Sequence, residues 1–398
     1  MSGPEEIVRI AAKGDGVTAG GRHVPLAVPG DIVHPDGSLE HGPHHARPAC
    51  RHFGTCGGCQ LQHADEEALR RFVTDRVVNA AAGQDMEAGE VLPTFLSPPS
   101  SRRRATLHGL RAKNRVLLGF REQRSHKIID IAECPVLRPE LFALVQPLRK
   151  LLGIIAGRGP VDVQLTLTDQ GADCMISGVE LDGLGPTEAV LDFAQAQGLA
   201  RLTLDQGYGA EAMWEPDPVT VTLGSVAVPF PAGSFLQPGD DGEAALVADA
   251  IEFLAGSQRI ADLFSGLGTF AFALAGRAEV TAVEAARDAH LSCRLAAGRA
   301  QLPLVAEHRD LFRNPLQPDE LARFDAVVLD PPRAGAREQV AALAGSAVER
   351  ICYVSCNPSS WARDARQLVE AGYRLERLRP VGQFRWSTHV ELTSLFTR

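Results

Sequence analysis

Residues 262–271 read Asp262-Leu263-Phe264-Ser265-Gly266-Leu267-Gly268-Thr269-Phe270-Ala271 and decide the fold. An apolar strand leads into two glycines, and a helix-forming run follows, which is the strand–turn–helix unit of a nucleotide-cofactor domain. Glycines there let the backbone approach a ligand closely. The spacing alone fits either a dinucleotide or S-adenosylmethionine. We favour S-adenosylmethionine because the carboxylate of Asp262 would be unfavourable beside a pyrophosphate.

Three more apolar runs, at residues 280–284, 326–330 and 351–355, read as strands, each followed by a helical pattern. This alternation is typical of a doubly wound, Rossmann-like parallel sheet and begins near Gly233. We therefore predict an α/β protein whose C-terminal part, residues 233–398, is the catalytic domain.

The N-terminal half has a different pattern. Short, Gly-rich, strand-like runs predict a small β-barrel over residues 1–46. Residues 47–232 are expected to form a central domain with an antiparallel sheet, because alternating apolar runs extend from Leu107 to about Val228. Residues 65–90 read as helical and could pack on the catalytic domain instead.

Composition fits a soluble globular protein, with 398 residues, 45% hydrophobic and 22% charged. No apolar run reaches the ~18 residues of a membrane span, and the first residues lack a signal-peptide pattern. We expect a cytoplasmic monomer in which the eight cysteines are not disulfide-bonded.

Charge is segregated along the chain. The net charge of −9 argues mildly against nucleic acid, but residues 102–127 contain nine Lys and Arg and one acid, Glu122. That stretch is either a phosphate-binding face or the solvated surface of a hairpin.

Two acids are placed to bind a nucleotide cofactor. Glu284 ends the strand after the glycine loop, where it could accept hydrogen bonds from ribose hydroxyls; the alternative is a solvated strand-end acid. Asp310 follows the presumed third strand and could meet the adenine edge, or it could cap a helix.

Cys356 is the candidate nucleophile. It lies in Tyr353-Val354-Ser355-Cys356-Asn357-Pro358, where an apolar strand ends, and Asp330-Pro331-Pro332-Arg333 follows a neighbouring strand. The carboxyl ends of parallel strands form the ligand-binding edge of such sheets. A thiolate there can add to C6 of a pyrimidine and activate C5 toward an electrophilic methyl group, while Asp330 holds the ring. The alternative for a lone cysteine is an inert buried thiol, which we expect of Cys352.

The sequence of the Asp330–Arg333 loop limits which class of base the enzyme could methylate. Arg333 stands where amino-directed methyltransferases have an aromatic, and the loop lacks the second cysteine of RNA cytosine-5 enzymes. A base must also remove the C5 proton. Glu391 is our candidate, provided that burial raises its pKa; His389 is the competitor, and a structural ion pair is the remaining alternative.

Four cysteines lie outside the catalytic sheet, at Cys50, Cys56, Cys59 and Cys134. Four thiolates can hold zinc or an iron–sulfur cluster, and the spacing leaves both open. The glycines between Cys56 and Cys59 favour a cluster, since they expose backbone N–H groups to sulfur.

Taken together, the chain resembles the bacterial RNA (uracil-5-)-methyltransferases, in particular the iron–sulfur branch that acts on 23S ribosomal RNA. The motifs that carry this resemblance run in order along nearly the whole chain. They are Cys50 to Gln60, Gly119-Phe120 through Cys134, Gly233-Ser234-Phe235-Leu236-Gln237, Asp262 to Gly268, Asp330 to Arg333, Ser355 to Pro358 and His389-Val390-Glu391.

The resemblance implies roles for individual residues. It implies a 4Fe-4S cluster on the four cysteines, Cys356 as nucleophile and Glu391 as base. It also implies that Gln237 contacts the cofactor or the target base, and that Phe264, Glu284 and Asp330 line the cofactor and base pocket. With Gly266 and Asp310 from the loop pattern, these are the predicted cofactor-binding residues. The N-terminal barrel resembles a TRAM domain, an OB-type RNA-binding module, and is shorter than usual. Two alternatives stay open, a tRNA-directed enzyme of the same chemistry and a non-catalytic iron–sulfur RNA-binding protein.

Overall fold

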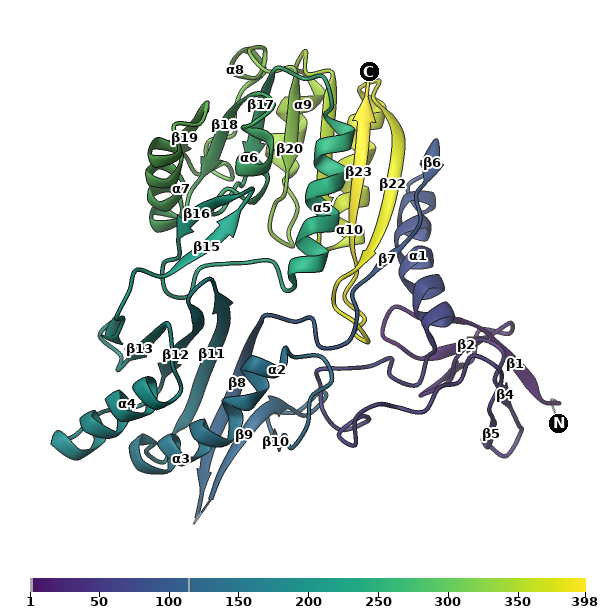
Figure 1. Cartoon of the computed structure of the whole chain (residues 1–398). Helices are drawn as coiled ribbons and strands as arrows, with labels where there is room; N and C mark the ends of the chain where they lie inside the picture. Colours follow the sequence, from purple (N-terminus) through teal and green to yellow (C-terminus); the bar gives the residue numbers. More distant parts are fainter. Residues whose placement is uncertain (1–2, 114) are drawn as a thin grey trace.

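The structure is a computed structural model that describes residues 3–113 and 115–398. Its sheets follow one another along the chain (Figure 1). A small N-terminal sheet lies beside helix α1, a seven-stranded sheet lies in the central part, and a nine-stranded sheet contains the C-terminus. The α/β fold class is confirmed.

The N-terminal sheet is a curled, antiparallel half-barrel of the OB type. Its order is β3-β2-β1-β4-β5, and its end strands do not pair with each other in the part of the chain described. Ile7, Val24, Ala27 and Val33 form its small core. The strands are β1 (Glu5–Ile10), β2 (Gly16–Thr18), β3 (His23–Val24), β4 (Ile32–Val33) and β5 (Leu39–Glu40).

The segment after this sheet packs on the C-terminal sheet. Of residues 65–90, only α1 (Glu66–Ala82) is helical; Asp65 caps it by accepting from the Ala68 N–H. Two short strands, β6 (Glu90–Val91) and β7 (Phe95–Leu96), then pair with β22. Part of the segment that we placed in the central domain thus completes the C-terminal sheet, and the division at residues 46 and 232 stays a prediction.

The central sheet has the order β10-β9-β8-β11-β12-β13-β14. It is antiparallel except for the parallel pair β12–β13, which a helical crossover connects. Its elements are β8 (Arg104–Ala112), β9 (Arg115–Arg121), β10 (Ile128–Asp130), α2 (Pro139–Ala143), α3 (Val145–Ile155), β11 (Pro160–Thr168), β12 (Gly171–Ser177), α4 (Leu184–Ala196), β13 (Arg201–Asp205) and β14 (Ala210–Trp214). A hairpin of β15 (Thr220–Leu223) and β16 (Val226–Pro229) leads to the C-terminal part.

The nine-stranded sheet has the order β19-β18-β17-β20-β21-β23-β22-β6, with β7 also on β22. Strands β17 to β21 are parallel, and β23 is antiparallel to β21 and β22. The strands are β17 (Arg259–Leu263), β18 (Glu279–Glu284), β19 (Leu304–His308), β20 (Ala326–Leu329), β21 (Arg350–Ser355), β22 (Arg374–Gly382) and β23 (Glu391–Thr397).

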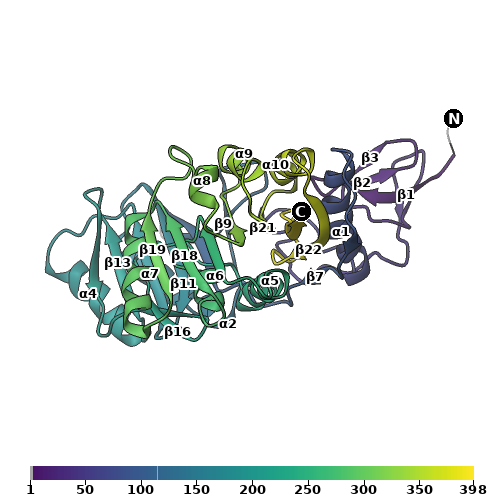
Figure 2. The ribbon, with the colours of Figure 1, turned by 90° about the horizontal axis from the view of Figure 1, so that it is seen from above.

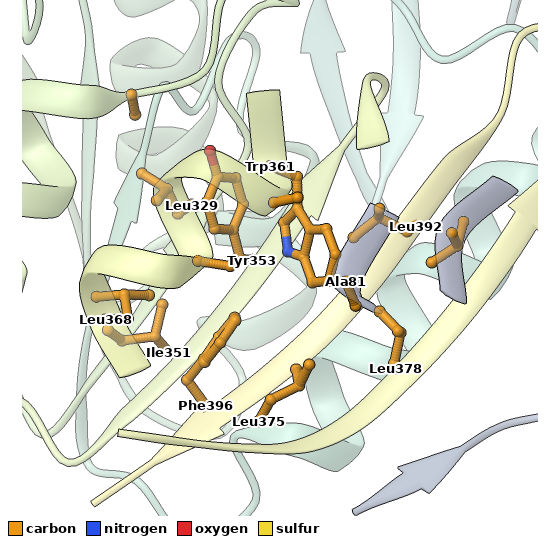
Figure 3. Packing of buried hydrophobic residues seen from close by; sticks show 14 of the residues in the cluster. Ala81, Leu329, Ile351, Tyr353, Trp361, Leu368, Leu375, Leu378, Leu392 and Phe396 are labelled. Carbon is orange, nitrogen blue, oxygen red and sulfur yellow. The ribbon is translucent and has the colours of Figure 1, made fainter. Parts of the chain in front are cut away.

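Helices cover both faces of this sheet (Figure 2). One face carries α5 (Asp240–Phe253), α6 (Thr269–Leu274) and α7 (Arg287–Ala300), and the other carries α8 (Pro318–Leu321), α9 (Arg337–Ala344) and α10 (Pro358–Glu370). Figure 3 shows the core under α10, where Trp361, Tyr353 and Phe396 pack together. The indole N–H of Trp361 donates to Ser394 Oγ at 2.9 Å, so this buried polar atom is satisfied.

The order of the strands fixes the place of the site. The chain runs outward from β17 to β18 and β19, then returns to β20 on the other side of β17. Ligands bind at such a switch point, at the carboxyl ends of the strands. No helix in the described residues has the length and apolar character needed to cross a membrane.

Candidate active site

A cavity of about 840 Å³ lies at this switch point. The loops after β17, β18, β20 and β21 line it, as does the segment before α5. The sequence-predicted residues on its wall are Gln237, Phe264, Gly266, Glu284, Asp310, Asp330, Cys356 and Glu391. Segments that are far apart in the sequence therefore meet in one cavity.

The glycine loop is shaped by left-handed backbone. Gly266 has φ +56° and a Cβ there would meet nothing within 4 Å, so this position faces open space. Gly268 has φ +96°, and a Cβ would come within 2.9 Å of the Phe272 ring. The first glycine leaves room for a ligand, and the second permits close packing of the loop on α6.

Glu284 holds the loop. Its two carboxylate oxygens accept from the N–H groups of Gly266 at 2.8 Å and Ala286 at 2.6 Å. Each oxygen keeps a lone pair that a ribose hydroxyl could use. Asp310 accepts from the Phe312 N–H at 3.0 Å, so it caps a turn while also lining the cavity. Phe264 and Phe312, with ring centroids 5.2 Å apart, give this end of the cavity apolar walls.

Buried carboxyls lie under the cavity. Burial, followed by the nearby Asp330 charge, raises the pKa of Asp262 to about 8. One Asp262 oxygen accepts from the Ala271 N–H at 2.9 Å, and the other has no partner among the residues that the structure describes. Burial also raises the pKa of Asp330 to about 7. A buried carboxyl oxygen without a partner is a hydrogen-bonding position that a bound ligand or water can satisfy.

Cys356 and Glu391 face one another because of strand pairing. Ser355 pairs with Leu392 in the antiparallel β21–β23 register, so the next position outward places Cys356 opposite Glu391. Burial, and then the charge of Glu391, raises the pKa of the Cys356 thiol to about 11. Burial raises the pKa of Glu391 to about 8, and the Gln383 amide lowers it. His389 lines a different cavity, where its Nδ1 lies 3.3 Å from Arg333 Nη2.

Gln383 is a site residue that the sequence analysis missed. Its buried side-chain amide donates to Glu391 Oε2 and to Gln237 Oε1, the latter at 3.0 Å. It thereby links the candidate base to a residue of the Gly-Ser-Phe-Leu-Gln motif. Nothing in the sequence around Gln383 signals this role.

The basic stretch 102–127 is divided by the fold, so it does not form one phosphate-binding face. Arg103 points inward and donates to Gln237 O at 3.0 Å and Glu243 Oε2 at 2.6 Å. Arg102 and Arg104, on the alternate side, lie over the rings of Phe384 and Phe235 at 5.1 and 4.4 Å. Burial lowers the pKa of Arg104 to about 10.

The four predicted metal-binding cysteines line a second cavity of about 610 Å³. Burial, with a smaller contribution from neighbouring cysteines, raises the pKa of Cys59 to about 12. Within the described residues, no group of three or more His, Cys, Asp or Glu side chains is close enough to hold one metal ion. The segment that follows Cys59 is hydrogen-bonded to the loop before Glu391. The N–H groups of Gln60 and Leu61 both donate to Trp386 O, at 2.7 and 2.9 Å.

A mostly parallel sheet of this order, with a glycine loop and an acidic strand end at the switch point, is a Rossmann-like nucleotide-cofactor fold. The comparisons give the family. The profile described as tRNA (Uracil-5-)-methyltransferase matches residues 293–398. An uncharacterized RNA methyltransferase of Zymomonas mobilis is 49% identical over 99% of this chain and 100% of its own length. The chain belongs to the RNA (uracil-5-)-methyltransferase family and is an RNA methyltransferase.

Two further relatives are informative. The 23S rRNA (uracil(1939)-C(5))-methyltransferase RlmD of Pectobacterium atrosepticum is 34% identical over 90% of this chain and 81% of its own. The crystal structure of Pyrococcus abyssi tRNA (uracil-54, C5)-methyltransferase in complex with S-adenosyl-L-homocysteine has a TM-score of 0.76. That likeness covers 99% of this chain and 100% of the other at 23% identity, and it shows the fold.

Proposed function

We propose that this chain methylates C5 of one uridine in 23S ribosomal RNA, with S-adenosylmethionine as methyl donor. The observation that carries the proposal is that Cys356 and Glu391 follow from neighbouring positions of paired strands and line one cofactor-sized cavity. The name of the 34% identical relative favours ribosomal RNA. A tRNA substrate is the second candidate, favoured by the names of the matching profile and of the solved structure.

The residues that line the cavity fit S-adenosylmethionine, and residues from different loops would contact different parts of it. Gly266 leaves space, Glu284 keeps lone pairs for ribose hydroxyls, and Phe264 provides an apolar wall. The turn-capping Asp310 lines the cavity and adds negative charge for the cationic parts of the ligand, and the buried Asp262 lies beneath it. When bound, S-adenosylmethionine supplies an electrophilic methyl group.

The chemistry follows from four side chains. Asp330 and Gln237 hydrogen-bond the uracil edge. The Cys356 thiol gives up its proton to solvent and the thiolate forms a bond to C6, which makes C5 a nucleophile. After C5 has gained the methyl group, Glu391 accepts the C5 proton, the C5–C6 double bond re-forms and the thiolate leaves. Phe235, 60% exposed, is placed to stack against the flipped-out nucleotide.

A trapping experiment tests this assignment. The protein is incubated with labelled S-adenosylmethionine and unmodified RNA, and the labelled nucleoside is mapped. We expect label in 5-methyluridine at one 23S position. Glu391→Gln should accumulate a covalent protein–RNA complex that survives denaturation, because the C5 proton stays in place. Cys356→Ala should form neither product nor complex.

A control variant and the alternative outcomes distinguish the proposed function from its competitors. Cys352→Ala alters a thiol in β21, the strand that leads to Cys356, and should keep methyl transfer. Label in tRNA would move the enzyme to the second candidate. Turnover by Cys356→Ala would mean a different nucleophile, and RNA binding without transfer by any form would favour a non-catalytic RNA-binding protein.

We also propose that Cys50, Cys56, Cys59 and Cys134 hold a 4Fe-4S cluster. Four thiols and intervening glycines gathered at one cavity support this. Iron and sulfide analysis of anaerobically purified protein tests it against zinc. We propose further that the enzyme is a cytoplasmic monomer, which size-exclusion chromatography and cell fractionation check.

A further inference from the structure

A basic groove lies at the far end of the β8–β9 hairpin, beside α3. It has a volume of about 660 Å³. The charged and polar residues that line it are Arg111, Lys113, Arg115, Asp130, Gln146, Arg149 and Lys150. Five of these seven side chains are basic, in a chain whose net charge is −9.

Most of this positive charge is not neutralised within the protein. Arg149 takes up the one carboxylate, pairing with Asp130 at 2.6 Å and also donating to Ile131 O. Lys113, Arg115 and Lys150 are exposed, and in the described part of the chain none of the three forms an ion pair. Three cations held by a hairpin and a helix can therefore each meet an external anion.

The hairpin connects this groove to the active site. Arg104, at the start of β8, lies over Phe235 on the wall of the catalytic cavity. Ala112 ends the same strand, and eight residue steps at the strand rise of ~3.3 Å separate them by about 25 Å. Figure 1 shows the hairpin extending away from the nine-stranded sheet. The groove is thus beyond the reach of the target nucleotide itself.

The N-terminal half-barrel is a poorer partner for phosphate. Residues 1–46 contain three basic residues against six acidic ones. One of the three, Arg22, lies 3.8 Å from Glu5. The OB-type fold alone would assign RNA binding to this part, but its charge opposes a polyanion.

We propose that Lys113, Arg115 and Lys150 form a phosphate-binding site for the backbone of the substrate RNA, about 25 Å along β8 from Arg104 beside the catalytic cavity. This groove, rather than the N-terminal half-barrel, supplies most of the electrostatic affinity for long substrates. The inference rests on the proposed function, since it takes RNA as the substrate. The distance corresponds to roughly seven stacked nucleotides at ~3.4 Å each.

Paired variants and two substrates test this. The groove variant is Lys113→Gln/Arg115→Gln/Lys150→Gln, and its matched control is Arg9→Gln/Lys13→Gln/Arg22→Gln in the half-barrel. All six positions are exposed, so both variants should fold, which thermal unfolding checks. Each is titrated, over a range of salt concentrations, with an RNA of about five nucleotides around the target and one of about thirty, sizes chosen from the ~3.4 Å spacing.

We expect the groove variant to bind the long RNA at least tenfold more weakly. The slope of log K against log salt should fall by about 2, since each lost phosphate contact removes ~0.7–0.9. The groove variant should bind the short RNA as the wild type does and should keep the wild-type kcat at saturation. The control variant should bind both RNAs with wild-type affinity. An unchanged slope, or an equal loss in the control, would overturn the proposal. Because binding is measured directly, a failure of the groove is distinguishable from an enzyme that methylates neither RNA.

Discussion

At the scale of single residues, the link from Gln383 to Glu391 sets the protonation of the candidate base. The buried amide donates a hydrogen bond to the carboxylate, which holds the pKa of Glu391 below the value that burial alone would give. Catalysis needs the deprotonated form to accept the C5 proton. The wild-type rate should therefore fall as the pH drops below about 8.

Gln383→Leu should move the acid limb of the pH–rate profile, where the rate falls with falling pH, to higher pH. Without the donor, the pKa of Glu391 rises further, so less carboxylate is present at neutral pH and more alkaline buffer should restore part of the rate. Single-turnover methyl transfer between pH 6 and 10 measures the shift. Gly242→Ala offers an indirect variant, because its Cβ would come within 2.4 Å of Gln383 Oε1. An acid limb that stays in place in both variants would show that Gln383 does not tune the base.

At the scale of elements, α10 holds the loop that follows β20. Asp364 on α10 accepts from the Ala336 N–H and the Tyr353 hydroxyl, both at 2.8 Å, and is fully buried. Near the start of α10, the Asn357 side chain donates to Arg333 O at 3.0 Å. The Asp330–Arg333 loop is thereby fixed against the strand that carries Cys356.

Asp364→Ala should lower the free energy of unfolding by about 3 kcal/mol, because two buried donors lose their acceptor. Tyr353→Phe should cost less, about 1 kcal/mol, since it removes one hydrogen bond and leaves the other. Urea unfolding of both variants and of the double variant gives the coupling between them. If the two effects add without coupling, the hydroxyl and the carboxylate do not act together.

At the scale of the whole molecule, the cysteine-lined cavity and the active site share one loop. Residues 384–389 line the cysteine cavity in part, and Glu391 lies two residues beyond them in the catalytic cavity. Gln60 and Leu61, directly after Cys59, hold this loop through Trp386 O. Backbone hydrogen bonds thus connect the segment after Cys59 to the loop that leads to Glu391.

Cys59→Ser should therefore lower kcat/KM and RNA affinity at least tenfold while leaving S-adenosylmethionine affinity within about twofold. The predicted cofactor-binding residues Phe264, Gly266 and Glu284 lie on the β17 loop and at the end of β18, which these bonds do not touch. Calorimetry with the cofactor, RNA binding and metal content are measured on the same preparation. Equal losses of RNA and cofactor affinity would indicate general unfolding, and no loss would show that the loop is stable without its anchor.

The sequence by itself determined the features that depend on neighbouring residues. The apolar runs, the glycine loop and the turns after Leu329 and Ser355 follow from local periodicity and backbone preference, so the parallel sheet and the placement of Asp330 and Cys356 at its edge could be predicted. The choice of Cys356 as candidate nucleophile follows from the same local sequence pattern.

Tertiary structure alone decided what depends on register and strand order. The β21–β23 pairing places Glu391 opposite Cys356, and the continuation of β22 places Gln383 beside Glu391. Side-chain alternation at the start of β8 divides the basic stretch, turning Arg103 inward and leaving Arg115 at the far end of the hairpin. Local propensity carries no information about such contacts, because they form between segments whose pairing is selected by the packing of the whole chain.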